Sequence, residues 1–598
     1  MLDRRRFVAT CSALGFGTTL LPGTLWALAH GDVQVTKEMI DQASVIADVP
    51  ITPEQRDAML DRLTRAIEGY DAIHALHIPN TVAPALDFNP TLPSMTFPTD
   101  KHPARLSPAP RRDVPRQLED LCYATVRELA ELVRARKVSS AALTEMYLTR
   151  LKRLDPTLHC VITLTEDRAL AQAKEADRDI AAGRYRGPLH GIPWGAKDLL
   201  AVKGYPTTWG AGGFEQQMID DDATVVTRLD QAGAVLIAKL TLGALAMGDL
   251  WFGGKTRNPW NTQQGSSGSS AGPASATAAG CVAFSIGSET LGSISSPSTR
   301  CGCTGLRPTF GRIPRTGAMA LSWSMDKLGP ICRSVEDTAL VLDAIYGPDG
   351  HDRTVRAVPF NWDAQLDWRR LRVAYLKSDF EGGPPPTSAL AAPLTDDAKK
   401  QQELQRLHAD YDRQYDKAAL AKLASMGVTM TPVDLPKLPW QAITALLGVE
   451  AAAAFDDLTR SGRDKLLTEQ SPNDWPNQFR VARFVPAVEY VQANRARMLA
   501  IEAMAALFEH YDVIVAPTNS TQLVVTNLTG HPAVIVPNGF RGTDSPPFAP
   551  TPPPGNFGGP GTPVSLTFLG PLYSEATLLA FARAYQDATP FHQQHPTV

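Results

Sequence analysis

The sequence predicts an α/β protein in which a large mixed or largely parallel β-sheet is surrounded by helices. Short apolar runs within 193–202, 225–240 and 281–289 alternate with segments that have helical spacing of apolar residues. That alternation is typical of a sheet flanked by helices. The chain has 598 residues, of which 43% are hydrophobic and 20% charged, so its length and composition allow a large core.

Residues 1–29 have the form of an export signal. The arginines of "RRRF" precede a weakly apolar stretch, and Ala27-Leu28-Ala29 forms an A-x-A cleavage pattern. The arginine cluster resembles a twin-arginine signal, which predicts a periplasmic or secreted protein. A membrane anchor is the alternative, but Pro22 and several glycines interrupt the stretch, and no other segment predicts a membrane span.

Residues 30–116 predict an N-terminal helical extension followed by a strap. Thr52 and Pro53 begin a segment of helical spacing that runs to residue 76. From 79 to 116 proline recurs every few residues, a composition that favours an extended chain lying on a surface.

The main domain is expected over 117–598. Two amphipathic helices are predicted within 125–156, the second beginning at the "SSAA" of 139–142. The region 395–510 is predicted to be mainly helical and, with the 540–562 loop, to line the substrate pocket. Buried strands are expected again at 511–518, 531–540 and 563–570.

Charge and cysteine content exclude several classes of protein. The formal net charge is −4 and no long basic run occurs beyond the N-terminus, which argues against a nucleic-acid partner. Seven cysteines are too few for a disulfide framework in a chain of this length. Cys301 and Cys303 are two apart with no second pair nearby, so they predict buried small hydrophobes rather than a zinc site.

Common hydrolase and nucleotide motifs fail when they are tested. No G-x-S-x-G surrounds the serines of 265–273, no H-E-x-x-H is present, and no glycine-rich loop ends in G-K-[ST]. Ser324 and Lys327 match the S-x-x-K of penicillin-recognising enzymes. The K-T-G and S-D-N that accompany it there are missing, so this match is interpreted as a turn.

Residues 265–317 resemble the signature block of the amidase signature family. The stretch "GSSGSSAGPASATAAGCVAFSIGSETLGSISSPSTRCGCTGLRPTFGR" is similar to G-G-S-S-G-G-S, a small-residue helix, G-T-D-x-G-G-S-I-R-x-P and C-G-x-x-G-x-K-P-T-x-G-R. The segments around 187–211, 256–261, 530–540 and 563–570 are similar to the family as well, so the resemblance covers about 120–590. It implies the amidase-signature fold, a large mixed sheet surrounded by helices.

The resemblance places the catalytic lysine at Lys197, a cis-peptide serine at Ser269 and the nucleophile at Ser293. Physical chemistry agrees, because a serine hydroxyl needs a neighbouring base and the block contains no histidine. A lysine kept neutral by burial can serve as that base. The main-chain N–H groups of Thr290, Leu291, Gly292 and Ser293 are expected to form the oxyanion hole.

Other polar residues near these positions are predicted to be structural. The hydroxyls of Ser266, Ser267 and Ser270 are expected to bond the loop backbone. Asp198, beside the lysine, and His531, beside a proline turn, are also interpreted as structural.

The block departs from the family pattern at three positions. Glu289 stands at the family's Asp and Ser295 at its Arg, and these two form an ion pair in the family; Arg300 is the expected replacement cation. Leu291 stands at a glycine. Because leucine disfavours positive φ, we expect Leu291 at negative φ, with the bend made by Gly292 and Gly287. Its side chain is then expected to point into the acyl pocket.

The function that the resemblance implies is hydrolysis of the carboxamide C–N bond of a small-molecule substrate through an acyl-enzyme on Ser293. No metal or cofactor is expected. "GSETLGSI" is closer to the E-T-x-G-S of exported peptide-amide hydrolases than to the tRNA-dependent glutaminase branch. An esterase or carbamate hydrolase on the same triad is one alternative, and a catalytically silent binding protein on this scaffold is another. Nothing in the sequence specifies the oligomeric state or the substrate.

Overall fold

The computed structural model describes residues 35–46, 51–60, 63, 79–80, 82, 86–381, 396–546 and 558–598. Contacts divide the chain into two units. One comprises Met1–Val82 with Phe484–Glu489, and the other Ala83–Arg483 with Tyr490–Val598. The expected signal, 1–29, lies outside the described residues. In the first unit, α3 spans Lys37–Ile46, and residues 53–60 of the expected 52–76 helix are helical.

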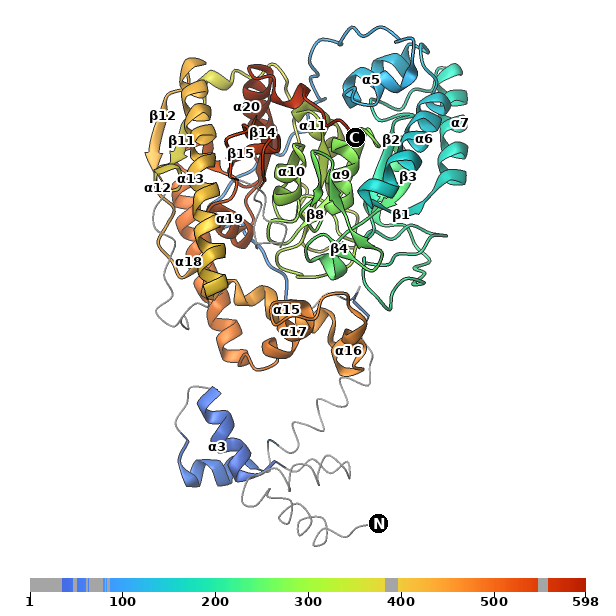
Figure 1. Cartoon of the computed structure of the whole chain (residues 1–598). Helices are drawn as coiled ribbons and strands as arrows, with labels where there is room; N and C mark the ends of the chain where they lie inside the picture. The colour runs from blue at the N-terminus through green and yellow to red at the C-terminus, as the bar shows by residue number, and fades with distance from the viewer. Residues whose placement is uncertain are drawn as a thin grey trace. The chain divides into compact units, whose positions relative to one another are not determined.

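The second unit is built on one sheet of eleven strands (Figure 1). Across the sheet the strands are β1 (Val161–Leu164), β3 (Val235–Leu240), β2 (Pro193–Lys197), β8 (Phe284–Glu289), β10 (Lys327–Cys332), β9 (Thr304–Arg307), β14 (Ala533–Phe540), β15 (Pro563–Leu569), β13 (Val513–Pro517), β11 (Val373–Leu376) and β12 (Met430–Val433). Two small hairpins pair β4 (Leu250–Trp251) with β5 (Gly254–Lys255), and β6 (Arg257–Asn258) with β7 (Asn261–Gly265).

The sheet is mixed, which confirms the predicted fold class. Strand β2 pairs in parallel with β3 and β8, and β11 pairs in parallel with β12 and β13. The remaining neighbours in the large sheet are antiparallel. Every residue of β2, β3 and β8 is buried, which explains why these strands appear in the sequence as continuous apolar runs.

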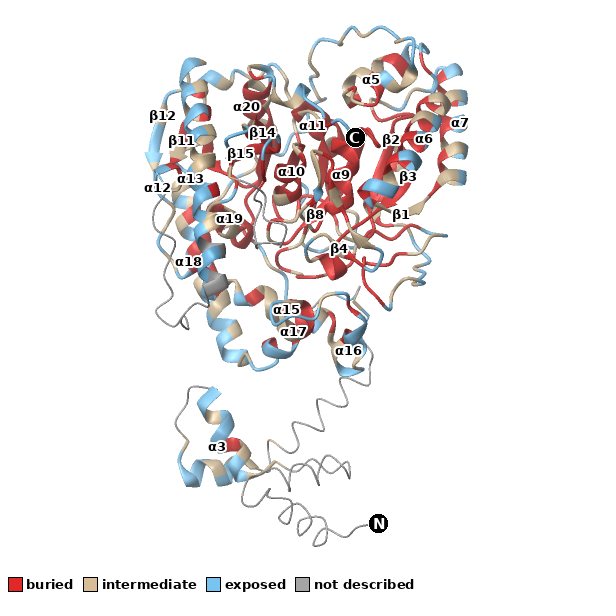
Figure 2. Cartoon of the chain, viewed as in Figure 1, coloured by how far each residue is buried: buried red, intermediate tan, exposed pale blue. Residues whose placement is uncertain are grey.

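Helices surround this sheet (Figure 1). They are α5 (Val126–Arg134), α6 (Ser140–Leu158), α7 (Glu166–Ala181), α8 (Thr224–Gln231), α9 (Ala271–Ala278), α10 (Ser295–Cys301), α11 (Val335–Ile345), α12 (Lys377–Glu381), α13 (Asp396–Ser425), α14 (Trp440–Ile443), α15 (Ala445–Ala454), α16 (Asp456–Arg460), α17 (Trp475–Ala482), α18 (Ala487–Phe508), α19 (Gln522–Thr529) and α20 (Glu575–Asp587). In Figure 2, α9, α10 and α11 are almost wholly buried, whereas α13 and α18 alternate between buried and exposed residues.

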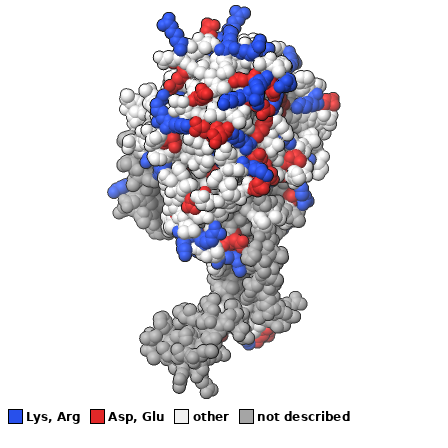
Figure 3. All heavy atoms as spheres, turned by 90° about the vertical axis from the view of Figure 1, so that its right-hand side faces the viewer, with Lys and Arg blue, Asp and Glu red and all other residues white. Residues whose placement is uncertain are grey.

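The two helices predicted within 125–156 are present. Thr125 caps α5 in a reciprocal capping box with Glu128, and the Ser139 hydroxyl accepts from the N–H of Ala142 to begin α6. On the face that carries α5–α7, cationic and anionic side chains are interspersed (Figure 3). The region 395–510 is mainly helical as predicted, but it also contributes β12, which the sequence analysis missed.

Residues 86–116, here called the strap, contain no helix, and their one bridge joins Arg105 to Asp363. The strap belongs to the second unit and contacts the rest of that unit through scattered side chains. Phe97 packs edge-on against Tyr573, with ring centroids 5.1 Å apart, and the Ser107 hydroxyl donates to Glu336 at 2.6 Å. None of the helices described for this chain combines the length and apolarity that a membrane crossing needs.

Candidate active site

Lys197 is the last residue of β2 and its side chain is completely buried. Its Nζ lies 2.8 Å from Ser269 Oγ, 2.8 Å from Ser288 Oγ and 3.2 Å from Ser270 Oγ. Burial lowers the pKa of Lys197 well below its usual range, and the more distant carboxylates of Asp326 and Glu289 only partly oppose this shift. The amine therefore loses its proton at a lower pH than an exposed lysine does.

A neutral amine has two N–H groups and one lone pair, so it needs two acceptors and one donor around it. The three hydroxyls around Lys197 can meet that need. The Ser270 hydroxyl donates to the Ser288 carbonyl at 3.0 Å, so toward Lys197 it acts as an acceptor. The Ser288 hydroxyl can take the second amine hydrogen. The lone pair of the amine is then left for the proton of Ser269.

Ser269 follows a cis peptide bond from Gly268 and is 1% exposed. The loop that carries it is fixed by close packing. A Cβ on Gly268 would overlap the carbonyl oxygen of Gly248, and the Asp249 carboxylate accepts from the N–H of Ser267 at 2.9 Å. The serine- and glycine-rich stretch is thus a rigid part of the core rather than a linker.

Ser293 lies between β8 and α10 and is half-buried. Its carbonyl accepts from the N–H of Ser270 at 3.0 Å, which joins the two serine-bearing segments beside Lys197. The Ser293 hydroxyl forms no hydrogen bond with the described residues, and the N–H groups of Leu291, Gly292 and Ser293 likewise have no acceptor among them. A partly exposed hydroxyl and three free N–H groups therefore occur in one short turn.

The backbone of this turn bends at Gly292, which has a φ of +97°, while Leu291 has a negative φ, as predicted. The expected role of Gly287 is wrong. It has no positive φ, and it is needed because a Cβ there would come within 2.6 Å of Ser270 Oγ. The half-buried Leu291 side chain packs against an apolar cluster that includes Met325 and Val525.

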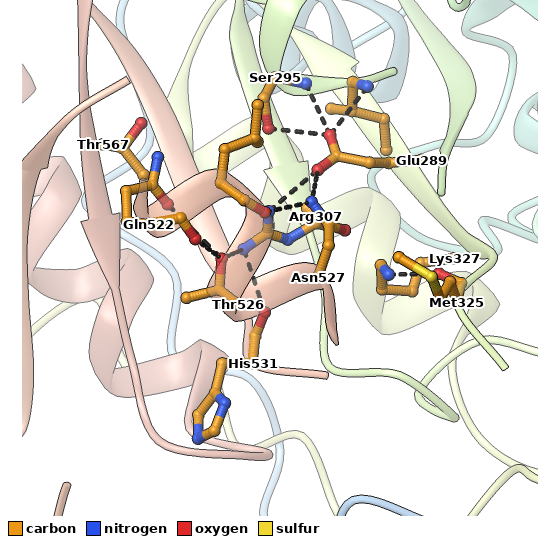
Figure 4. A network of polar contacts seen from close by, with 12 residues as sticks. Glu289, Ser295, Arg307, Met325, Lys327, Gln522, Thr526, Asn527, His531 and Thr567 are labelled. Carbon is orange, nitrogen blue, oxygen red and sulfur yellow. Dashed lines mark hydrogen bonds and ion pairs between the residues drawn. The ribbon is translucent and has the colours of Figure 1, made fainter. Parts of the chain in front are cut away.

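Glu289 holds the other end of the turn (Figure 4). Its Oε2 accepts from the N–H groups of Ile294 and Ser295 at 3.0 and 2.8 Å and from the Ser295 hydroxyl at 2.8 Å. Its Oε1 accepts from Arg307 at 2.9 Å and from Asn527 at 2.7 Å. Although burial opposes ionisation, Arg307 and these hydrogen bonds lower the pKa of Glu289 to about 2.

The expected replacement of the family's cation by Arg300 is wrong, because Arg307 pairs with Glu289. Arg300 donates instead to the carbonyl of Gly265 at 3.2 Å. Arg307 is fully buried and is fixed on its other side by Thr526 at 2.6 Å and by the His531 carbonyl at 3.2 Å. Arg307 of β9, held by three contacts, thus takes the place of the arginine that the family has at Ser295 in α10.

Two serines near Lys197 were not assigned correctly from the sequence. Ser270, expected to bond only the loop backbone, also contacts Lys197, whereas Ser266 donates to the Ser267 carbonyl as expected. Ser288 was missed. The available signal was a serine near the end of an otherwise apolar strand, but it acquires meaning only when β8 is known to pair with β2.

The remaining polar candidates have structural surroundings. Asp198 accepts from Thr208 at 2.5 and 2.8 Å and pairs with Lys239 at 2.6 Å. His531 bonds Thr529 at 2.8 Å, and burial lowers its pKa to about 3.

The S-x-x-K match does not form a serine–lysine pair, because Lys327 donates to the carbonyl of Met325 whereas Ser324 bonds Glu450 and Arg497. The six described cysteines are buried and unbonded to one another, as expected for small hydrophobes. In the described parts of the chain, no group of three or more His, Cys, Asp or Glu side chains is placed to hold a metal ion.

Comparison with known proteins identifies what this chain is similar to. A family model described as Amidase matches residues 142–396. A glutamyl-tRNA(Gln) amidotransferase subunit from Geobacillus thermodenitrificans is 32% identical over an alignment 518 residues long that covers 79% of this chain and 99% of that protein. The corresponding subunit from Thermosynechococcus vestitus is 30% identical over the same length.

Solved structures share the fold. The native peptide amidase of Stenotrophomonas maltophilia superposes with a TM-score of 0.63 at 30% identity, covering 79% of this chain and 98% of that one. An amidase family protein of Bacillus anthracis reaches a TM-score of 0.66 over 80% of this chain and 93% of its own, and its 21% identity shows the fold alone.

Proposed function

Because this chain belongs to the amidase signature family and is a serine-type amide hydrolase, we propose that it works through an acyl-enzyme on Ser293. Ser269 and Lys197 relay the proton in this proposal. The observation that carries it is the 2.8 Å contact between Lys197, whose pKa is lowered by complete burial, and the Ser269 hydroxyl. A neutral amine is a base, and a hydroxyl in contact with it can pass it a proton.

The proposed reaction proceeds in two balanced halves. Ser293 Oγ attacks the amide carbon as its proton passes to Ser269 Oγ and the Ser269 proton passes to Lys197 Nζ. The same relay then runs backward, so that the proton reaches the leaving nitrogen as the C–N bond breaks. Water repeats the sequence on the acyl-enzyme to release the acid. Proton relay of this kind contributes about 10²–10⁴ in rate.

The hydroxyls of Ser270 and Ser288 serve both charge states of Lys197. In the neutral state they accept its two N–H bonds, which directs the lone pair at Ser269. When Lys197 has taken the proton, all three hydroxyls accept from the ammonium. The site thus stabilises the transient cation without a carboxylate that would hold the proton permanently.

The N–H groups of Leu291, Gly292 and Ser293 are proposed as the oxyanion hole, together with that of Thr290. Because Glu289 binds the N–H groups of Ile294 and Ser295, it closes the turn behind Ser293 and leaves the preceding groups to face the substrate. Preorganised donors of this kind are worth about 10²–10³ in kcat each.

For the substrate we propose amides with apolar or aromatic acyl groups, such as peptide amides or aryl amides. Leu291 packs on an apolar cluster beside the turn, and the peptide amidase of Stenotrophomonas is among the similar structures. The tRNA amidotransferase subunits are also similar, so glutamine is the competing substrate.

Leu291→Gly should lower the ratio of kcat/KM for an aryl amide to that for glutamine several-fold. An unchanged ratio would mean that Leu291 serves packing alone.

The test of the mechanism combines labelling with turnover. A fluorophosphonate should label Ser293 in the wild-type protein, and Ser293→Ala should abolish both labelling and amide hydrolysis while the unfolding midpoint stays unchanged. A panel of primary amides, anilides, peptide amides, esters and carbamates separates an amidase from an esterase or carbamate hydrolase. Wild-type turnover in Ser293→Ala would refute the acyl-enzyme, and an unlabelled, inactive wild type would favour a binding protein.

Export is proposed on the N-terminal residues, which lie outside the described structure. The support is the arginine cluster before a weakly apolar stretch and the A-x-A pattern at 27–29. Replacing Arg5 and Arg6 by lysine should retain the protein inside the cell, as measured by fractionation. Unchanged export would refute a twin-arginine route.

A further inference from the structure

The strap precedes the region that the family model matches, which begins at residue 142, and one of its side chains reaches the interior. The Phe88 ring lies over the guanidinium of Arg497, with the guanidinium carbon 3.5 Å from the ring centroid. The same ring packs edge-on against Phe310 at 5.0 Å. Arg497 belongs to α18 and is 1% exposed, so the strap covers the face of a buried cation.

Each nitrogen of the Arg497 guanidinium donates one hydrogen bond. Its Nε donates to the carbonyl of Leu528 at 2.6 Å, and its two Nη atoms donate to the hydroxyl and carbonyl of Ser324 at 2.7 and 2.8 Å. These bonds lie in the plane of the guanidinium, and Phe88 supplies an aromatic surface over its flat face. Arg497 therefore ties the strap to the turn that contains Ser324.

That turn, residues 321–326, is held from two sides. Glu450 accepts from Ser324 N and Oγ at 3.0 and 2.7 Å and from the Ser322 hydroxyl at 2.7 Å. Within the turn, Asp326 Oδ2 accepts from the N–H groups of Leu321 and Ser322 at 2.8 and 2.9 Å. The turn thus has little freedom as long as Arg497 and Glu450 stay in place.

The same Asp326 carboxylate reaches the nucleophile turn. Its Oδ1 accepts from the Thr290 hydroxyl at 2.6 Å, and Thr290 begins the stretch that leads to Ser293. Glu289 fixes the far end of that stretch through Ile294 and Ser295. Asp326 therefore holds the near end, next to the pairing of Glu289 with Lys327 across β8 and β10, and it belongs to the turn that Arg497 holds.

We propose that Phe88 is a positioning residue for the hydrolase. By covering Arg497, the strap holds the 321–326 turn, and through Asp326 and Thr290 this turn aligns the N–H groups that stabilise the oxyanion. The inference rests on the proposed function, because it assigns the strap to the same oxyanion hole. It makes the strap part of the catalytic unit rather than a tether between an N-terminal extension and the enzyme.

The first measurement compares two strap phenylalanines. Phe88→Ala should lower kcat about tenfold with KM changed less than twofold, because only the transition state carries the developing oxyanion. Phe97→Ala, a matched control that loses a similar ring contact at Tyr573, should keep kcat within about twofold. Phe88→Leu keeps an apolar side chain over Arg497 but removes the ring. This variant should fold even if Phe88→Ala does not, and its kcat should fall about threefold.

The second measurement tests the route. Thr290→Val removes the hydroxyl that Asp326 holds and keeps the side-chain volume. If the strap acts through Asp326 and Thr290, Phe88→Ala should cause no further loss of kcat in the Thr290→Val protein. Affinity for an aryl trifluoromethyl ketone, which forms a tetrahedral adduct with serine, should fall with kcat in Phe88→Ala and remain unchanged in Phe97→Ala.

The outcomes separate the two proposals. If wild type labels at Ser293 and hydrolyses amides while Phe88→Ala and Phe97→Ala behave alike, the strap only stabilises the fold and the inference is wrong. An additive loss in the double variant would also overturn it. If wild-type protein neither labels nor turns over any amide, the proposed function fails and the positioning role falls with it.

Discussion

Two fully buried lysines on neighbouring strands have different surroundings. Lys239 lies in β3 beside Ala196 of β2, and Lys197 follows Ala196 directly. Lys239 Nζ is 2.6 Å from Asp198 and also donates to the Pro206 carbonyl and the Thr207 hydroxyl. Lys197 contacts three serine hydroxyls and, among the described residues, has no carboxylate within ion-pair distance.

The comparison shows that the partner, more than burial, decides what a buried lysine can do. Burial lowers the pKa of both amines, but at Lys239 the Asp198 carboxylate opposes the shift from direct contact. Breaking a buried ion pair of this kind requires several kcal/mol, so Lys239 does not readily give up its proton. Hydroxyls orient an amine without fixing its charge, so Lys197 can change protonation state within each catalytic cycle.

The largest expected effect comes from exchanging the two lysines for methionine. Lys197→Met should lower kcat/KM by at least about 10³, because the relay loses its base. Lys239→Met should mainly destabilise the fold, by about 3–5 kcal/mol, because Asp198 is left buried without its cation. Urea unfolding and amide turnover on the same preparations check both. A Lys239 variant that folds normally but is as inactive as Lys197→Met would contradict the division of roles.

A smaller effect is expected from Ser288→Ala. The change removes one of the two acceptors that orient Lys197, so kcat should fall by about tenfold while the triad remains complete.

In wild type, kcat/KM should rise with pH through an apparent pKa well below 10.4, since the relay needs neutral Lys197. Loss of an acceptor for the ammonium should move that midpoint downward. Ser285→Ala on the same strand is the control, because Ser285 bonds Thr277 and the Pro273 carbonyl, away from Lys197. An unshifted midpoint in Ser288→Ala would separate Ser288 from the base.

The sequence predicts Lys197, Ser269 and Ser293 as one set because the motif has fixed spacing along the chain, and the structure brings Lys197 and Ser269 into contact. The partners of these residues could not be predicted, since they depend on strand order. Arg300 is closer to Glu289 in sequence than Arg307 is, but α10 directs it to Gly265. Arg307 comes from β9, which is separated from β8 by β10, and its side chain still reaches Glu289.

The dependence on tertiary pairing also explains which strands and contacts the sequence predicts and which it does not. The apolar runs identified the central strands because those strands are buried on both faces. Strand β12 was missed because it follows a long helix and its residues are partly exposed, so its pattern is not that of a buried strand. The contact of the strap with Arg497 joins residues far apart in sequence, and nothing in the proline spacing indicates it.

The pH dependence of stability gives the subtlest test of the comparison. A lysine that is neutral in the folded state and charged in the unfolded state binds more protons when unfolded. Between the lowered folded pKa and the unfolded value near 10.4, wild-type stability should therefore rise with pH by about 1.4 kcal/mol per unit relative to Lys197→Met. Below the folded pKa the penalty is constant, and above the unfolded value it disappears.

The change of this stability difference with pH reflects the titration of Lys197 alone. The contacts with Ser269, Ser270 and Ser288 that the variant loses affect its stability equally at every pH. Urea unfolding of both proteins at several pH values from about 7 to 10, up to the unfolded pKa near 10.4, measures this slope. Thr163→Val is the reference for titration elsewhere, because Thr163 is an uncharged, partly exposed residue of β1. A difference between wild type and Lys197→Met that stays flat across this range would mean that Lys197 is charged in the folded protein. In that case Lys197 would resemble Lys239, and the relay would need another base.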